Sequence, residues 1–203
     1  MAISTYAELQ TAVSNWLDRS DLSARAPEFI TLAESRIARK LRVREQEAEA
    51  SVSITGGTRT AALPSDFSEV RRLYIDGNPV RFLEYMTPQD YWNRHTSTQA
   101  GKPSVFTIEG SNLVFGPSPD ASYTGKLQYY RNLPALSSSA HGVFTSNPDI
   151  YLYGALTAAE PFLKNDKRFP LWKAQFDEAM LELETQTRKH QGPMRMRDDS
   201  NPY

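Results

Sequence analysis

The sequence predicts an α+β protein: a helical bundle formed by the N- and C-terminal helices, an antiparallel β-rich insert and an extended C-terminal arm. Near both ends of the chain, apolar residues recur at the spacing of an amphipathic helix. In the middle they alternate with polar residues, which is the period of a half-buried strand. Residues 191–203 contain Gly192, Pro193 and Pro202 and no periodic apolar face, so we expect no independent fold there.

Length and composition fit one domain, or one domain with a sizeable insert, in a chain of 203 residues. A hydrophobic fraction of 39% and a charged fraction of 23% are typical of a globular protein with a buried core. We expect N-terminal helices in 1–45, the insert with a short helix in 46–131, a loop and C-terminal helices in 132–190, and the arm in 191–203.

Charge and cysteine content exclude several classes of function. The net charge of -1 provides no overall basic field that would attract nucleic acid or anionic lipid. Cysteine is absent, which excludes disulfides, thiol nucleophiles and zinc sites with sulfur ligands. We expect no signal peptide at the N-terminus, and no window approaches the roughly 18 apolar residues that a membrane-spanning helix needs.

The first helix is indicated by Thr5 and Glu8, which have the spacing of a capping box. Residues 18–21 end it. Its apolar positions are Tyr6, Leu9, Val13, Trp16 and Leu17.

A second helix should begin near Pro27, because proline is favoured in a first helical turn. Its apolar stripe consists of Phe29, Ile30, Ala33, Ile37 and Leu41. Its last turns, where cations suit the negative end of the helix dipole, carry the basic cluster Arg36, Arg39, Lys40, Arg42 and Arg44. This cluster can be a DNA contact, a solvated face matched to the dipole, or a contact between subunits.

The β-rich insert begins with alternation over 47–54, followed by the turn Gly56-Gly57 and a return strand over 58–63. These features predict a hairpin. A short helix should open at Thr87-Pro88. Because the strands are joined by turns, we expect an antiparallel sheet. The other predicted strands are 70–75, 80–83, 105–109, 112–115 and 123–131.

The C-terminal helices follow a Ser-rich loop over 132–146. Asn147-Pro148-Asp149 should open one helix, which Pro161 should kink or restart. The final helix spans roughly 167–189. Its predicted apolar face consists of Leu171, Trp172, Phe176, Met180 and Leu183, and its predicted solvated face carries Glu178, Glu182 and Glu184.

The C-terminal arm alternates thioether and guanidinium side chains. An extended segment with this pattern can place apolar groups into a groove on another protein while its forked donors reach acidic partners. The alternative is a frayed terminus without a role. The candidate docking residues are Met194, Arg195, Met196, Arg197 and Tyr203.

Catalytic motifs are missing from the sequence. His95, His141 and His190 fall in loops or at helix ends and lack the spacing of a metal pair. No phosphate-binding glycine loop and no GxSxG elbow occur. Glu47 and Glu49 share one face of a strand, but nothing indicates a pocket that would separate their pKa values. The sequence therefore predicts no enzyme, no cofactor and no metal.

Short segments spread over nearly the whole chain resemble, in their order, the head-to-tail adaptor (connector) proteins of tailed phages. Each segment is weak by itself, and the order makes the resemblance specific. The segments are 5–9, 29–37, 41–44, 63–67, 71–73, 106–108, 127–130, 147–149, 151–156 and Trp172.

The resemblance implies a structural protein of the virion, assembled in the host cytoplasm and placed at the head–tail junction. Its subunits would pack through helices into a twelvefold ring beneath the portal protein and above a downstream tail or nozzle protein. DNA would pass through the lumen without sequence-specific binding, and no membrane would be involved. Residues 191–203 correspond by position to the arm that docks on the portal.

Two other functions remain open at this point. One is a DNA-binding phage assembly factor that uses the cluster from Arg36 to Arg44. The other is an enzyme such as a cell-wall hydrolase, which would need a carboxylate or histidine cluster in a cleft.

Overall fold

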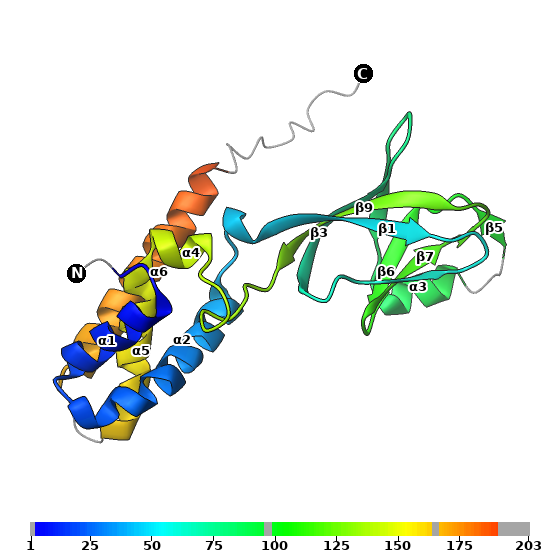
Figure 1. Cartoon of the computed structure of the whole chain (residues 1–203). Helices are drawn as coiled ribbons and strands as arrows, with labels where there is room; N and C mark the ends of the chain where they lie inside the picture. The colour runs from blue at the N-terminus through cyan, green and yellow to red at the C-terminus, as the bar shows by residue number, and fades with distance from the viewer. Residues whose placement is uncertain (1–2, 96–98, 164–166, 191–203) are drawn as a thin grey trace. The chain divides into compact units, whose positions relative to one another are not determined.

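The computed structural model describes residues 3–95, 99–163 and 167–190 (Figure 1). The chain divides into two compact units. The helical unit comprises residues 1–45 and 133–203 and the sheet unit residues 46–132, each over its described part. Residues 191–203, for which we predict an extended arm, lie outside the described residues.

The secondary structure confirms a protein of mixed helices and strands. The helices are α1 Tyr6–Leu17, α2 Ala26–Lys40, α3 Pro88–Arg94, α4 Gly142–Ser146, α5 Pro148–Leu163 and α6 Phe169–His190, with 3-10 turns η1 Ser20–Arg25 and η2 Arg44–Gln46. The strands are β1 Glu47–Ile54, β2 Thr60–Ala62, β3 Phe67–Ile75, β4 Arg81–Tyr85, β5 Ala100–Gly101, β6 Val105–Glu109, β7 Asn112–Gly116, β8 Ser118–Pro119 and β9 Tyr123–Arg131.

Helix α1 begins with the predicted capping box. The Thr5 hydroxyl accepts from the Glu8 amide, and the Glu8 carboxylate accepts from the amides of Thr5 and Ser4 at 2.9 and 2.8 Å. These bonds to the charged form, first of all from the Ser4 amide, lower the pKa of Glu8 to about 2. The helix ends at Asp18, whose φ of 54° lies in the left-handed region.

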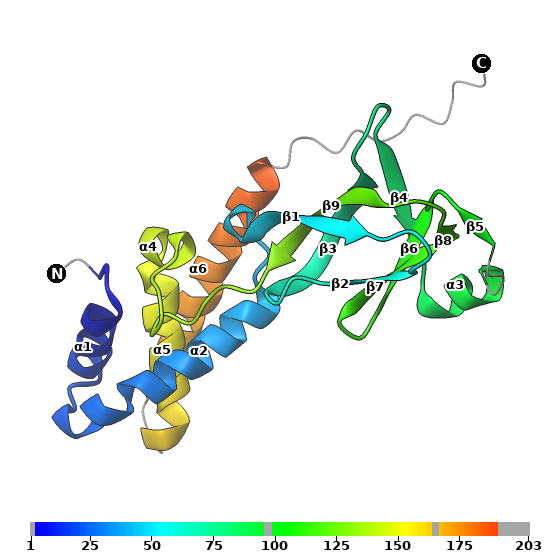
Figure 2. The same cartoon turned by 45° about the vertical axis from the view of Figure 1, so that its right-hand side comes forward.

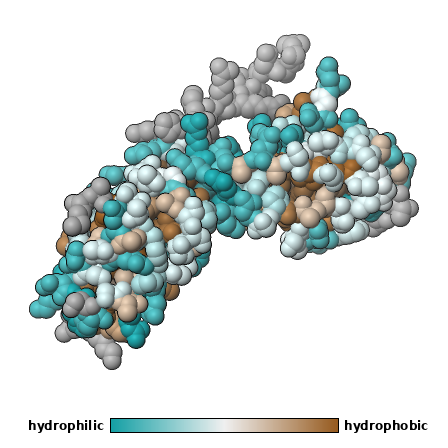
Figure 3. Space-filling view, viewed as in Figure 1, coloured by the Kyte–Doolittle hydropathy of each residue, from teal (hydrophilic) through white to brown (hydrophobic). Residues whose placement is uncertain are grey.

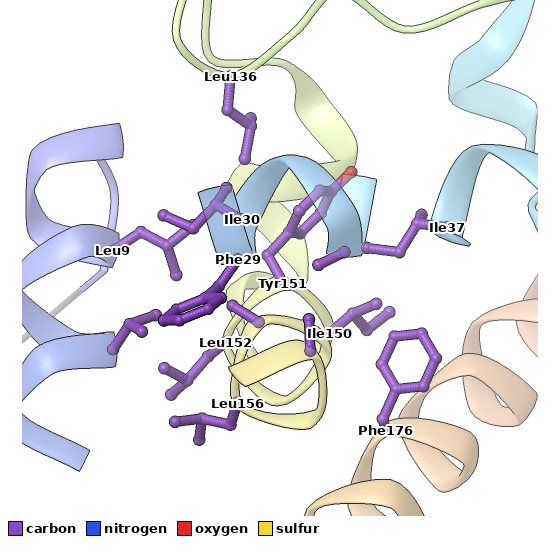
Figure 4. Close-up of a cluster of buried hydrophobic side chains, with 14 of the residues drawn as sticks. Leu9, Phe29, Ile30, Ile37, Leu136, Ile150, Tyr151, Leu152, Leu156 and Phe176 are labelled. Atoms are coloured by element: carbon purple, nitrogen blue, oxygen red, sulfur yellow. The ribbon is translucent and has the colours of Figure 1, made fainter. Parts of the chain in front are cut away.

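Helix α5 lies at the centre of the helical unit and contacts α1, α2 and α6. Figure 4 shows side chains from all four helices directed into one cluster. A Cβ atom at Gly154 of α5 would lie 3.0 Å from the Cβ of Ala33 and 3.1 Å from Phe176 Cε2. The absent side chain therefore lets α2 and α6 approach α5 closely. The largest buried members of the cluster include Leu9, Ile30, Ile37, Leu41, Phe144, Tyr151 and Phe176.

Three expectations for the helices are wrong in detail. Leu171 is 54% exposed, because it lies away from the stripe that Trp172 and Phe176 bury. Helix α5 does not restart at Pro161 but continues to Leu163, since a proline in the last turn removes little of the hydrogen-bonding pattern. The Ser-rich loop contains α4, a helix too short to produce a periodic pattern in the sequence.

The sheet unit contains a seven-stranded sheet in the order β1-β9-β3-β4-β6-β7-β2 (Figure 2) and a two-stranded sheet of β5 and β8. Alternate residues of the long strands are buried in one cluster, as the period of two predicts. Its buried members are Val52, Ile54, Leu73, Ile75, Leu83, Phe106, Leu113, Phe115, Leu127 and Tyr129.

The predicted hairpin between 47–54 and 58–63 is wrong. The whole of β1 pairs with β9, from Glu47↔Tyr130 to Ile54↔Tyr123, while the short β2 pairs with β7. The Gly56-Gly57 turn itself is present, and Gly57 has a φ of +76°. Because β9 is long enough to pair along all of β1, the distant strand takes the place of the local one.

The sheet is mostly but not wholly antiparallel, so the expectation that all its strands pair antiparallel is wrong. Strands β4 and β6 are parallel, with Tyr85 opposite Phe106, and α3 lies between them in sequence. Helix α3 begins with the predicted Thr87 cap, and its buried Tyr91 donates to the carbonyl oxygen of Phe115 at 2.8 Å. This helix supplies the crossover that a parallel pair requires.

Surface hydropathy is mixed on both units. Apolar residues reach the visible surface as separate patches between polar ones (Figure 3).

We predict that Gly154→Val destabilises the protein by about 1–3 kcal/mol, because the branched side chain meets α2 and α6 at too short a distance. Urea unfolding followed by circular dichroism measures the change. Gly142→Ala is the control, since its Cβ would find its nearest neighbour, Glu45 Cγ, at 3.8 Å. Equal stability of the two variants would contradict the close approach.

We predict that Glu8→Gln removes an acid-sensitive contribution to stability. The folded-state pKa of Glu8 lies below its ordinary value of 4.5, so the carboxylate stabilises the fold above that value. The contribution is lost as the pH falls from 4.5 towards 2. Thermal midpoints of the two proteins should therefore differ at pH 7 and converge near pH 2. A constant difference across this range would refute the role of the charge.

Candidate interaction surfaces of the helical unit

The predicted basic cluster does not form one patch. Arg36, Arg39 and Lys40 line a groove, whereas the guanidinium of Arg42 turns back to donate to main-chain carbonyls, including that of Leu41 at 2.6 Å. Arg44 is exposed in η2, beyond the end of α2. The structure therefore brings together three of the five predicted cations.

The groove lies between α2 and α6, with α5 beneath it, and has a volume of about 450 Å³. We call it the α2–α6 groove. Thr157 and Phe176 are buried and form its floor, while Phe169 is 38% exposed at its wall. Its lining consists of Arg36, Arg39, Lys40, Thr157, Pro161, Phe169, Lys173, Phe176 and Asp177.

The charge of the α2–α6 groove is predominantly positive. Its lining has four cationic side chains and one carboxylate, Asp177. The Lys40 ammonium lies 4.0 Å from Asp177 Oδ1, and both side chains are about half exposed. An ion pair of this kind contributes little stability, so the carboxylate does not neutralise the groove.

Three aromatic rings join α1 to α5 and α6. The ring of Trp16 lies 5.9 Å from Tyr153 and 5.5 Å from Trp172. The Arg168 guanidinium lies 5.9 Å from the Trp172 ring and donates to the Trp16 carbonyl oxygen at 3.3 Å. Trp16 remains 43% exposed and borders a hollow of about 340 Å³ on the outer face of α1, next to Ala12.

The half-buried carboxylate of Glu34 fixes the segment before α4. Glu34 of α2 accepts a hydrogen bond from the Leu136 amide at 2.6 Å, and burial raises the pKa of Glu34. Burial, followed by the nearby charge of Glu34, also raises the pKa of Tyr151. Tyr151 belongs to the core of the helical unit and Glu34 lies at its edge, so this arrangement has a structural role.

The structure places His95 and His141 at helix ends, and it places Glu47 and Glu49 in the lining of a hollow of about 260 Å³ on the sheet unit. His141 caps α4, where its Nδ1 accepts from the Phe144 amide, and His95 ends α3. Glu47 pairs with Arg71, and Glu49 lies 3.8 Å from Lys126. Among the described residues, no three acidic or histidine side chains are close enough to hold a metal ion.

The side chain of His190 and the candidate arm residues Met194, Arg195, Met196, Arg197 and Tyr203 lie outside the described residues. Sequence reasoning missed the other wall of the groove, which contains Phe169, Lys173 and Asp177. The pair Lys173 and Asp177 has a visible i, i+4 spacing, but its position opposite α2 requires the tertiary structure.

None of the described helices is long and apolar enough to cross a membrane.

The chain matches one of the known protein-family models over most of its length. The family described as SU10 adaptor protein matches residues 4–197, which is nearly the whole chain. No curated protein matches the sequence. The family match confirms the resemblance that the ordered segments carry, and it covers both the helical and the sheet unit. The chain therefore belongs to the SU10 adaptor protein family, a family of phage head–tail adaptors.

Proposed function

We propose that this protein is a structural adaptor that forms a ring beneath the portal, connects head to tail and lets DNA pass. The observation that carries this proposal is the family match over residues 4–197. In this function the helical unit is a bundle that packs against copies of itself. A downstream tail or nozzle protein is the further partner.

The helical unit has the physical properties of a ring wall. Its central helix α5 is largely buried, so the unit has a packed core of its own. Its surface still exposes large apolar side chains, including Trp16, Leu171 and Leu181, and a cationic groove. Exposed apolar groups next to polar ones are typical of surfaces that become buried in an assembly.

We further propose that residues 191–203 form the extended arm that docks on the portal. Met194 and Met196 would occupy apolar pockets, because a thioether chain adapts to irregular cavities. Arg195 and Arg197 would make charge-assisted hydrogen bonds to acidic residues of the portal. No catalytic step is part of this function.

We predict that deletion of residues 191–203 abolishes binding to the portal, since it removes the docking segment. Because residues 191–203 carry Gly192, Pro193 and Pro202 and no periodic apolar face, we expect circular dichroism and the thermal midpoint to stay unchanged. Pull-down with the purified portal measures the binding. A matched control, Asp198→Asn with Asp199→Asn, keeps the segment and all four Met and Arg side chains. Undiminished portal binding by the deletion variant would refute the arm.

The second candidate is the DNA-binding assembly factor, which the shared position of Arg36, Arg39 and Lys40 in one groove favours. A protein that uses these cations on phosphates should lose affinity steeply as salt rises. The adaptor function instead predicts no measurable binding of a duplex to the isolated chain at low salt. Fluorescence anisotropy with a labelled duplex distinguishes the adaptor from the DNA-binding factor. DNA binding that depends steeply on salt, and that Arg36→Ala and Arg39→Ala abolish, would favour the DNA-binding factor.

A further inference from the structure

Helix α6 presents two different surfaces on opposite sides. Phe169, Lys173 and Asp177, spaced four residues apart, line the α2–α6 groove. A second row follows the spacing i, i+4, i+7 and i+11, and we call it the α6 ridge; it consists of Leu171, Gln175, Glu178 and Glu182. Lys173 and Glu178 are separated by five residues, which corresponds to about 140° around a helix.

The α6 ridge is acidic, and all of its residues except the partly exposed Gln175 are exposed. Leu171 is 54% exposed, and Glu178 and Glu182 are both exposed. The Gln175 amide donates to Glu178 Oε2 at 3.5 Å, so the polar residues of the ridge contact one another. An exposed leucine beside two carboxylates is a surface with both apolar and negative character.

The groove and the ridge are complementary in charge and spacing. Arg36 and Lys40 are one helical turn apart at the rim of the groove, and Glu178 and Glu182 are one turn apart on the ridge. Four cations of the groove face one carboxylate, Asp177, within the same chain. The groove therefore has an excess of positive charge that an acidic helix would balance.

Apolar groups match in the same way. The groove contains Pro161 and the partly exposed Phe169 beside its buried floor. The apolar residue of the ridge, Leu171, would be removed from water when it covers this surface. An interface needs such a buried apolar group in addition to charged pairs at its rim.

We propose that the α6 ridge of one copy of this chain lies in the α2–α6 groove of the next copy. This inference rests on the proposed ring, for which it names the two contacting surfaces. Because the surfaces differ and face opposite ways on α6, each copy uses its groove towards one neighbour and its ridge towards the other. Such a heterologous contact builds a ring when its rotation closes.

The absence of native cysteine allows a direct test in the full chain. A variant with Arg39→Cys and Gln175→Cys carries one thiol at the groove and one on the ridge. A short bis-maleimide should link successive copies into a ladder of multimers on a denaturing gel. Each single-cysteine variant has one thiol per chain, so its cross-linked products should be no larger than a dimer. A link between the two thiols of one chain would give a product that runs as a monomer. Absence of multimers beyond the dimer in the double variant overturns the proposal.

Charge reversal in the double-cysteine background tests the chemistry of the contact. Glu178→Lys with Glu182→Lys should lower the yield of multimers on the order of tenfold, because two attractive pairs become repulsive. Reversal of the groove by Arg36→Glu with Lys40→Glu should restore the ladder when combined with the reversed ridge. Asp76→Lys with Glu84→Lys, an equal charge change at two exposed positions of the sheet unit, is the matched control.

The outcomes separate this contact from the proposed function. A ladder that is insensitive to both reversals shows another interface between copies and overturns the proposal. Multimers that form only with added duplex DNA identify DNA as the occupant of the groove and also overturn it. If the ladder is absent while the chain still binds the portal, the groove–ridge contact fails and the adaptor function stands.

Discussion

The close approach of α2 and α6 to α5 is the constraint on which the helical unit depends. Gly154 makes it possible, because Ala33 and Phe176 occupy the space that a side chain there would need. The same approach creates the α2–α6 groove, since it places the cations of α2 opposite Lys173. The absence of a side chain at Gly154 thus allows the helix packing on whose surface the groove lies.

Local signals in the sequence predict local structure well. The Thr5 cap, the Pro27 start and the alternation that gives β9 all appear in the structure, because each depends on residues close in the chain. Pairing of β1 with β9 could not be predicted in this way. The glycine turn after β1 favours a hairpin, and only the whole sheet shows that the distant strand pairs better.

The candidate surface could be predicted in part. The cations of α2 are visible in the sequence, but their distribution is not, since Arg42 turns to main-chain carbonyls while Arg39 remains at the groove. The opposite wall depends on the packing of α6 against α5, which no local pattern specifies. The functional class, a phage adaptor, could be predicted because the resemblance depends on the order of many short segments along the chain and not on any single site.

The position of the sheet unit within the chain has a consequence for biosynthesis. In the sequence, residues 46–132 separate the two parts of the helical unit, so α1 and α2 emerge from the ribosome long before α5. Until α5 is translated, Leu9 and Ile30 lack the helix that buries them. Until then, the apolar side chains of α1 and α2 are exposed and favour aggregation. Chaperones therefore protect the chain most during synthesis of the sheet unit.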